Sequence, residues 1–156
     1  MLGNTALALA ELDRVSAEHR GDPGVLEMEC EIRNAAQDWP GAFAVAERLV
    51  QADPEHVRGW ILRAYAARRI PGGGLELSQS LLQPALERFP KEFLVPYNLA
   101  CYAAQLGQVD RAWELLQQAL RLGGRSTVLR LAWSDPDLEM MRDRLRGTGG
   151  VSETTE

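Results

Sequence analysis

The sequence predicts an all-α fold made of paired helices. Ala, Leu, Arg and Glu are abundant, Gln also favours helices, and residues that favour strands are sparse. A pattern of an apolar helix, a glycine turn and a second helix spaced by small residues recurs along the chain. Helix starts are marked by an acceptor side chain before a proline, at Asp22-Pro23, Asp53-Pro54 and Asp135-Pro136. A chain of 156 residues is long enough to bury the core of one such domain.

The recurring pattern is clearest over residues 97–120. Apolar positions over 97–106 lead through Gly107 to a second helix with Ala112, Leu116 and Ala119 at its spaced positions. The upstream copies are Trp60-x3-Ala64-x2-Ala67 with Leu82-x2-Ala85-Leu86, and Val25-x2-Met28-x3-Ile32 with Ala42-x3-Ala46-x2-Leu49. This order resembles the tetratricopeptide repeat (TPR) family, whose helix-turn-helix unit is about 34 residues long. The resemblance implies a right-handed α–α superhelix, or TPR solenoid, with three degenerate repeats. Arg63 and Pro96 stand where the family prefers Leu and Trp.

The elements follow in order from these signals. We expect helices over residues 4–19, 24–37, 40–52, 55–69, 75–89, 92–106, 109–122 and 136–146, and a short turn or helix over 126–133. Pro84 should bend the helix over 75–89, because it removes a backbone hydrogen bond inside that helix. The segment Gly72-Gly73-Gly74 before it should form a flexible connection.

These elements are expected to form one TPR-like domain over residues 1–146. Its repeats should span about 23–56, 57–92 and 93–126, and the helix before them is interpreted as an N-terminal half-repeat. The helix over 136–146 should cap the third repeat, with Leu138, Met141 and Leu145 on the covering face. Residues 147–156 are small, polar and acidic, which predicts a disordered tail.

Composition argues against several classes of function. The net charge of −5 argues against nucleic-acid binding, and no apolar run approaches the ~20 residues of a membrane helix. We expect no signal peptide, because the apolar start lacks a basic residue and Glu11 interrupts it. Cys30 and Cys101 lie two repeats apart, so we expect buried free thiols and a cytoplasmic protein. No catalytic or metal-binding spacing is present, which predicts no enzyme activity, no metal and no cofactor.

One stripe of residues is a candidate binding site. Arg58, Ile61, Tyr65, Arg68 and Arg69 share one face of the helix over 55–69. In the TPR family the first helix of each repeat lines the concave surface, which implies a basic and aromatic groove. The matching stripe of the third repeat is Leu94, Tyr97, Cys101, Ala104 and Gln105, and that of the first includes Leu26, Cys30, Arg33 and Asn34. The alternative is that the arginines only solvate the helix or pair with Glu residues of a neighbouring helix.

The resemblance therefore implies a non-enzymatic interaction module. We expect it to bind a peptide or helical segment of a partner protein in the concave groove. Its predicted contact residues are Arg58, Ile61, Tyr65, Arg68, Arg69, Leu94, Tyr97 and Gln105. The two tyrosines would supply rigid contact area, and the arginines would favour acidic partners. Two alternatives stay open at this point, namely a small TPR-type secretion chaperone and a regulatory subunit or domain of a larger enzyme.

Overall fold

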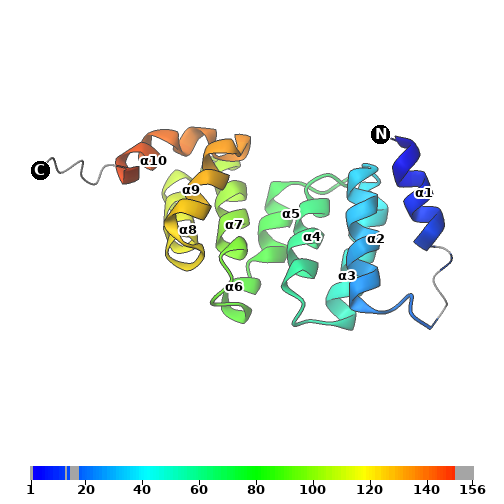
Figure 1. Ribbon diagram of the computed structural model, residues 1–156. Helices are drawn as coiled ribbons and strands as arrows, with labels where there is room; N and C mark the ends of the chain where they lie inside the picture. The colour runs from blue at the N-terminus through cyan, green and yellow to red at the C-terminus, as the bar shows by residue number, and fades with distance from the viewer. Residues whose placement is uncertain (1, 13, 15–17, 150–156) are drawn as a thin grey trace, which may run out of the picture. The chain divides into compact units, whose positions relative to one another are not determined.

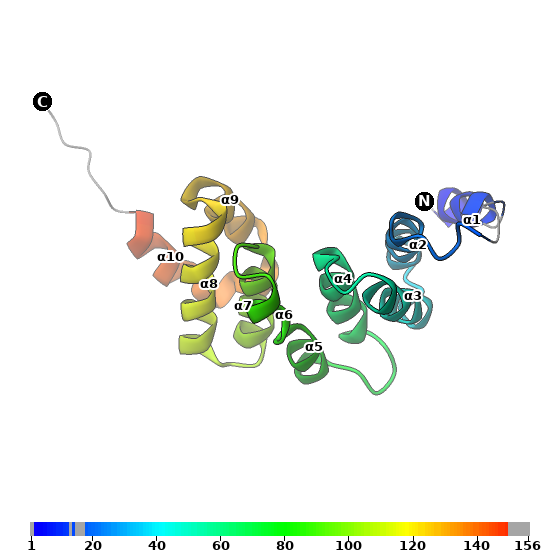
Figure 2. The ribbon, with the colours of Figure 1, turned by 90° about the horizontal axis from the view of Figure 1, so that it is seen from below.

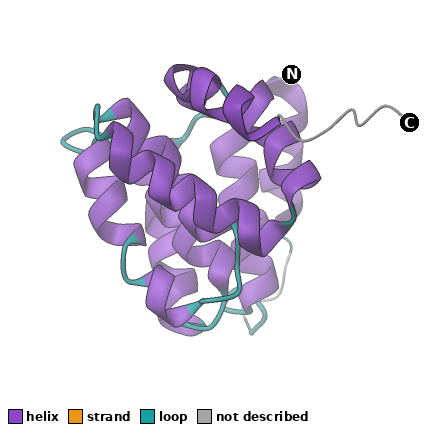
Figure 3. Ribbon diagram, turned by 90° about the vertical axis from the view of Figure 1, so that its left-hand side faces the viewer, coloured by secondary structure: helices purple, strands orange, loops and turns teal. Residues whose placement is uncertain are grey.

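The regular structure of the protein is helical. A computed structural model describes residues 2–12, 14 and 18–149, and within them every regular element is a helix (Figure 3). This confirms the all-α class. Across the same residues, no helix is both long and apolar enough to cross a membrane. The chain divides into two compact units, Met1–Pro90 and Lys91–Glu156, which are described here one at a time. A single domain over residues 1–146 stays a prediction.

The first unit is a run of helices in which each packs on the next. Its elements are α1 (Leu2–Leu12), α2 (Pro23–Ala35), α3 (Trp39–Ala52), α4 (Val57–Ala67), α5 (Leu75–Leu82) and α6 (Ala85–Arg88) (Figure 1). Consecutive helices from α1 to α5 contact one another, and α2 also contacts α4. The turn between α2 and α3 is short, so these two helices form a helical hairpin (Figure 2).

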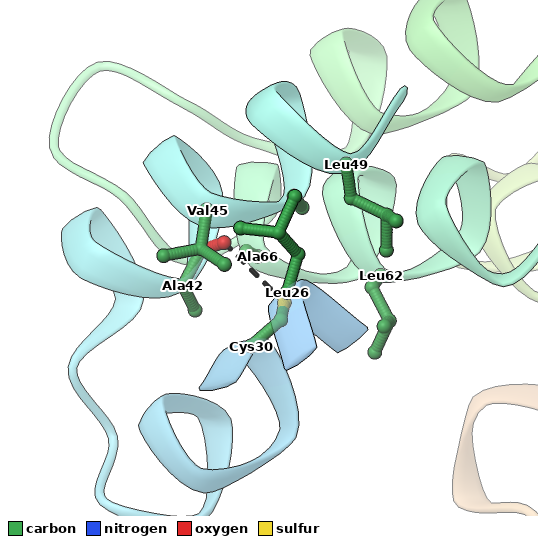
Figure 4. Close-up of a cluster of buried hydrophobic side chains, with 8 residues drawn as sticks. Leu26, Cys30, Ala42, Val45, Leu49, Leu62 and Ala66 are labelled. Carbon is green, nitrogen blue, oxygen red and sulfur yellow. Dashed lines mark hydrogen bonds between the residues drawn. The ribbon is translucent and has the colours of Figure 1, made fainter. Parts of the chain in front are cut away.

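The core of the first unit lies between α2, α3 and α4. Its buried side chains are Leu26, Cys30, Ala42, Val45, Ala46, Leu49, Leu62 and Ala66 (Figure 4). The Cys30 thiol donates to the carbonyl oxygen of Ala42 across the hairpin, at 3.4 Å. The prediction that Leu26 and Cys30 share a groove stripe is therefore wrong, because these two positions face α3. The prediction that Cys30 is a small buried core residue is confirmed.

The second unit surrounds α7. Its elements are α7 (Leu94–Gln105), α8 (Val109–Gly123), α9 (Arg125–Ser134), the 3-10 helix η1 (Pro136–Met141) and α10 (Arg142–Gly149). The helix α7 packs on α8 and on η1, while α9 contacts α8 and η1. Ala112 and Ala119 are fully buried, as predicted for the close crossing of the two helices of a repeat.

The C-terminal element covers α7 with its apolar side. Leu138, Met141 and Leu145 are buried, which confirms the predicted apolar face of this element. It is a 3-10 helix followed by an α-helix rather than one continuous helix. The Asp135 carboxylate accepts a hydrogen bond from the Asp137 N–H at 2.9 Å and so begins η1, as the Asp-Pro signal predicted.

Other boundaries differ from the predicted ones for local reasons. The helix over 75–89 breaks into α5 and α6 at Pro84, which confirms the predicted interruption. The start of α4 moves to Val57, since the Asp53 carboxylate accepts from the Glu55 N–H at 3.1 Å and holds a turn before the helix.

The two ends of the chain also differ from prediction. The first helix stops at Leu12, and residues 18–21 form turns rather than continuing it to residue 19. At the other end α10 runs to Gly149, three residues beyond the predicted end of the last helix, and the disordered tail stays a prediction. Its remainder, residues 150–156, lies outside the described residues.

Candidate functional site

Three side chains of the first unit meet in a group that we call the α3–α4 cluster: Trp39, Tyr65 and Arg69. Tyr65 is exposed, whereas Trp39 and Arg69 are part-buried. The rings of Trp39 and Tyr65 meet edge to face, with centroids 6.2 Å apart. The Arg69 guanidinium lies 3.9 Å from the Tyr65 ring centroid and 5.0 Å from that of Trp39. Tyr65 keeps 38% of its surface exposed. The cluster is thus a cation held against two aromatic faces at the protein surface.

The local backbone explains why these three side chains meet. Asp38 precedes α3 and accepts a hydrogen bond from the Gly41 N–H at 3.1 Å, which fixes Trp39 in the first turn. Tyr65 lies in the last turn of α4 and Arg69 in the turn directly after the helix, where its side chain returns over the Tyr65 ring. The Arg69 side chain also donates to the Tyr65 carbonyl oxygen at 2.8 Å. This bond holds the guanidinium over the ring.

Arg58, predicted to select acidic partners, is already paired inside the protein. Its guanidinium hydrogen-bonds to the carboxylates of Glu27 and Glu31, both on α2. His56 adds a contact of 2.6 Å between its Nε2 and a Glu27 oxygen. Burial opposes the charge on Glu27, but the bonds from His56 and Arg58 outweigh it and lower the pKa of this carboxyl. The alternative that the arginines pair with a neighbouring helix is therefore confirmed for Arg58.

The other residues of the predicted stripe on α4 are part-buried. Ile61 and Arg68 are neither fully exposed nor in the core. The structure thus brings Tyr65 and Arg69 together at one end of the stripe, whereas Arg58 faces the acidic side chains of α2 at the other end. The predicted basic groove is reduced in this unit to the aromatic and cationic α3–α4 cluster.

The matching stripe of α7 is mostly covered. Tyr97 is only 7% exposed, and its hydroxyl donates to an Asp135 carboxylate oxygen at 2.9 Å. Burial, with the nearby Cys101 and Asp135, raises the pKa of this phenol. Cys101 bonds the same oxygen at 3.5 Å, and Ala104 is also buried. Tyr97 therefore offers almost no surface to a partner, contrary to its predicted role.

The ends of that stripe remain nearer to solvent. Leu94 is part-buried at the start of α7, and Gln105 is exposed at its end. The Gln105 amide donates to the Asp137 carbonyl oxygen at 3.1 Å, which ties it to η1. The segment that covers this stripe of α7 lies about 30–40 residues further along the sequence. Helical periodicity within residues 92–106 carries no information about it.

Two residues have contacts that the sequence analysis did not predict. Trp39 is absent from the predicted binding stripe, although it is part of the α3–α4 cluster. Arg63 lies in the apolar side of α4, where its guanidinium is 4.9 Å from the Trp60 ring centroid and donates to the Leu81 carbonyl at 3.1 Å. Burial lowers the pKa of Arg63, although Glu47 partly opposes this. The signal available in the sequence was the place of Arg63 among apolar positions of α4, which indicates a side chain that contacts the neighbouring helix α5.

The titratable side chains of the described residues do not form a metal centre. Over residues 2–12, 14 and 18–149, no three side chains of His, Cys, Asp or Glu come together in a way that could hold an ion. His19 contacts the carboxylates of Glu18 and Asp22, while His56 contacts Glu27. No protein-family model matches the chain, and no curated protein is similar to it in sequence. The site is therefore argued from geometry alone.

Proposed function

We propose that this protein is a non-enzymatic interaction module that binds a segment of a partner protein at the α3–α4 cluster. The observation that carries this proposal is the stack of the Arg69 guanidinium on the exposed ring of Tyr65, beside the part-buried Trp39. Trp, Tyr and Arg are the side chains that most often dominate the energetics of protein interfaces. The three side chains here hold one another in place, so binding would cost little additional side-chain entropy.

The spacing of the helices supports a TPR-like solenoid as the scaffold. The helices α2, α4 and α7 start at Pro23, Val57 and Leu94, which is close to the repeat length of about 34 residues in that family. Each is followed by a second helix, and in the first unit α2 also contacts α4. In a TPR solenoid such first helices line the concave surface. The proposed partner segment would then pass the C-terminal end of α4, where Tyr65 lies.

The partner is expected to combine an acidic and an apolar side chain. Arg69 has N–H groups beyond the one given to the Tyr65 carbonyl, and these can pair with a carboxylate. The exposed part of the Tyr65 ring next to it suits an apolar side chain. Arg58 has no part in this proposal, because Glu27 and Glu31 already neutralise it.

The state of the reactive side chains supports a role without catalysis. Burial, aided by the charges of Glu31 and Glu29, raises the pKa of the Cys30 thiol to about 12, so no thiolate nucleophile forms there near neutral pH. Cys101 is buried as well and bonds Asp135. Free buried thiols also fit a reducing compartment, and we include a cytoplasmic location in the proposal.

A site-specific crosslinker tests the location of the binding site. We would place a photo-reactive phenylalanine at Tyr65 and, in a second protein, at Trp133, an exposed aromatic residue on α9 that is 40% exposed. Illumination in cell extract, followed by mass spectrometry, identifies the crosslinked peptides. We expect one dominant peptide with an acidic and an apolar residue at position 65 and not at position 133. Equal crosslinking at both positions would contradict the proposal.

The identified peptide then permits a quantitative test. Tyr65→Ala should weaken its binding about 30-fold or more, because interface hot spots contribute ~2 kcal/mol or more. Arg69→Lys keeps the charge but not the planar stack, so it should bind more weakly than wild type and more tightly than Arg69→Glu. Trp133→Ala serves as the matched control and should leave the Kd unchanged. Fluorescence anisotropy at low and high salt measures the Kd of the wild type and of the four variants.

A further inference from the structure

The first unit contains a pocket that shares no residue with the α3–α4 cluster. It has a volume of about 330 Å³ and lies between α1, α2, α3 and the turn before α2. Its lining residues are Leu9, Leu12, Arg20, Val25, Glu29, Arg33 and Arg48. Three aliphatic side chains thus share one small pocket with three arginines and a single carboxylate. The volume is at the lower end of the roughly 300–1,000 Å³ range for small-molecule sites.

One arginine of the pocket is fixed by the protein itself. Arg33 donates twice to one Glu29 oxygen, at 2.9 and 2.8 Å, and once to Asp38 at 2.7 Å. Burial opposes its charge, but these bonds outweigh it and raise the pKa of Arg33 further. Its donors are directed to the two carboxylates. Arg33 is therefore a wall of the pocket rather than a group available to a ligand.

A second arginine is held far more loosely. The closest approach of the Arg48 guanidinium to the free oxygen of Glu29 is 4.0 Å, and it donates to the Arg20 carbonyl at a long 3.4 Å. The Arg48 side chain is 53% exposed. Contacts this long contribute little, so the guanidinium can turn toward a ligand at small cost. Arg20 lines the same pocket and adds a further positive charge.

We propose that this pocket binds a small aliphatic monocarboxylate. The aliphatic part would lie against Leu9, Leu12 and Val25, and the carboxylate would accept hydrogen bonds from Arg48 beside Arg20. Planar guanidinium groups bind carboxylates with two parallel hydrogen bonds. When Asp38 is counted with the Arg33 that it pairs with, three arginines still outnumber two carboxylates, which disfavours a cationic ligand. The same chemistry is offered by a free short-chain acid and by the terminal carboxylate of a peptide that ends in leucine.

Titration of the full chain with matched probes tests this site. Sodium octanoate supplies the tail and the charge, octylammonium the same tail with the opposite charge, and acetate the charge alone. We expect octanoate to shift the amide resonances of α1, α2 and α3, with much weaker effects from the other two. N-acetyl-leucyl-leucine and its C-terminal amide separate the two sources. Tighter binding of the free-acid dipeptide than of octanoate assigns the site to a peptide terminus, and the reverse assigns it to a free acid.

Three variants decide between a site and unspecific uptake. Arg48→Ala should raise the octanoate Kd about tenfold, the effect of losing one charge-assisted contact. Val25→Asp should abolish binding by placing a charge in the apolar wall. Arg130→Ala, an exposed arginine on α9, is the matched control and should bind as wild type. An unchanged Kd in Arg48→Ala, or equal binding of octanoate and octylammonium, overturns the proposal. Neither result affects the α3–α4 cluster, which shares no residue with this pocket.

Discussion

The helices α4 and α7 show how differently two similar stripes can be used. Each is the first helix of a predicted repeat, and each carries a tyrosine on the stripe predicted to bind a partner. Tyr65 of α4 is 38% exposed and stacks with Arg69, whereas Tyr97 of α7 is 7% exposed and bonds Asp135. The difference is not in the stripes themselves. It arises because η1 covers α7 within the second unit.

This comparison indicates what a helical stripe does and does not determine. Periodicity decides which side chains share a face of a helix. Whether that face binds a partner or becomes core depends on any segment that packs against it, and the segment here begins at Asp135. The four predictions below test this difference, from the largest expected effect to the smallest.

Shortening Leu138, an apolar side chain of η1, should have the largest effect on the free energy of unfolding. Leu138→Ala should lower the free energy of unfolding of the second unit by about 2–5 kcal/mol, because the fully buried Leu138 would leave a cavity. Met140 is on the same 3-10 helix but 51% exposed, so Met140→Ala should change it by about 0.5 kcal/mol or less. Urea unfolding followed by circular dichroism measures both. Equal effects would show that η1 does not cover α7.

The contact between α7 and α8 can be tested by overpacking. Ala112 on α8 is fully buried, so Ala112→Leu should cost about 1–3 kcal/mol by forcing the helices apart. Gln117 is exposed on the same helix, and Gln117→Leu should leave the denaturation midpoint nearly unchanged. A midpoint for Ala112→Leu equal to that of wild type would show that α7 and α8 do not cross closely at this position.

The two tyrosines allow the most direct comparison. Tyr97→Phe removes the hydroxyl that bonds Asp135 and should cost about 0.5–1.5 kcal/mol of stability. Tyr65→Phe at the open stripe should cost less than about 0.5 kcal/mol, because no hydrogen bond of its hydroxyl is lost within the described structure. Thermal and urea unfolding of both variants would reveal the order. The reverse order would contradict the assignment of α7 as covered and α4 as open.

The ion pairs between α2 and α4 should give the smallest effect, a dependence of stability on pH. The folded protein lowers the pKa of Glu27 below its ordinary value of 4.5, chiefly through His56 and Arg58. A lowered pKa contributes stability above the unfolded value and loses it as pH falls through the folded one. Stability should therefore decrease below about pH 4.5, and Glu27→Gln should reduce that slope. Urea midpoints between pH 3 and 7 measure this dependence of stability on pH, and Glu114→Gln, at a solvent-exposed position, is the control.

Sequence patterns predicted the elements and much of the packing of the chain. The proline signals located α2 and η1, and small or apolar spacing predicted the burial of Ala112, Ala119 and Met141. These features are local, since they depend on residues within one or two turns. Boundaries such as the start of α4 shifted because capping side chains can hold a turn in place of helix.

The candidate site could be predicted only in part, because its contacts are not local. The stripe of α4 correctly grouped Tyr65 with Arg69, which are one turn apart. It could not show that Arg58 pairs with Glu27, since that contact joins two helices. Nor could it place Leu26 in the core. A small shift in the position of the predicted stripe along α2 changes which face of this helix is expected to meet α3. Contacts between helices therefore have to be seen in three dimensions.

The reactivity of the two cysteines can report local opening of the structure, once in each unit. Cys30 lies in the core of the first unit and Cys101 beneath η1 in the second, and both are free and buried. A thiol reagent can reach each one only when its surroundings open, so each labelling rate reports the opening equilibrium of one region. The chain thus allows the local stability of its two units to be followed separately, without any engineered label.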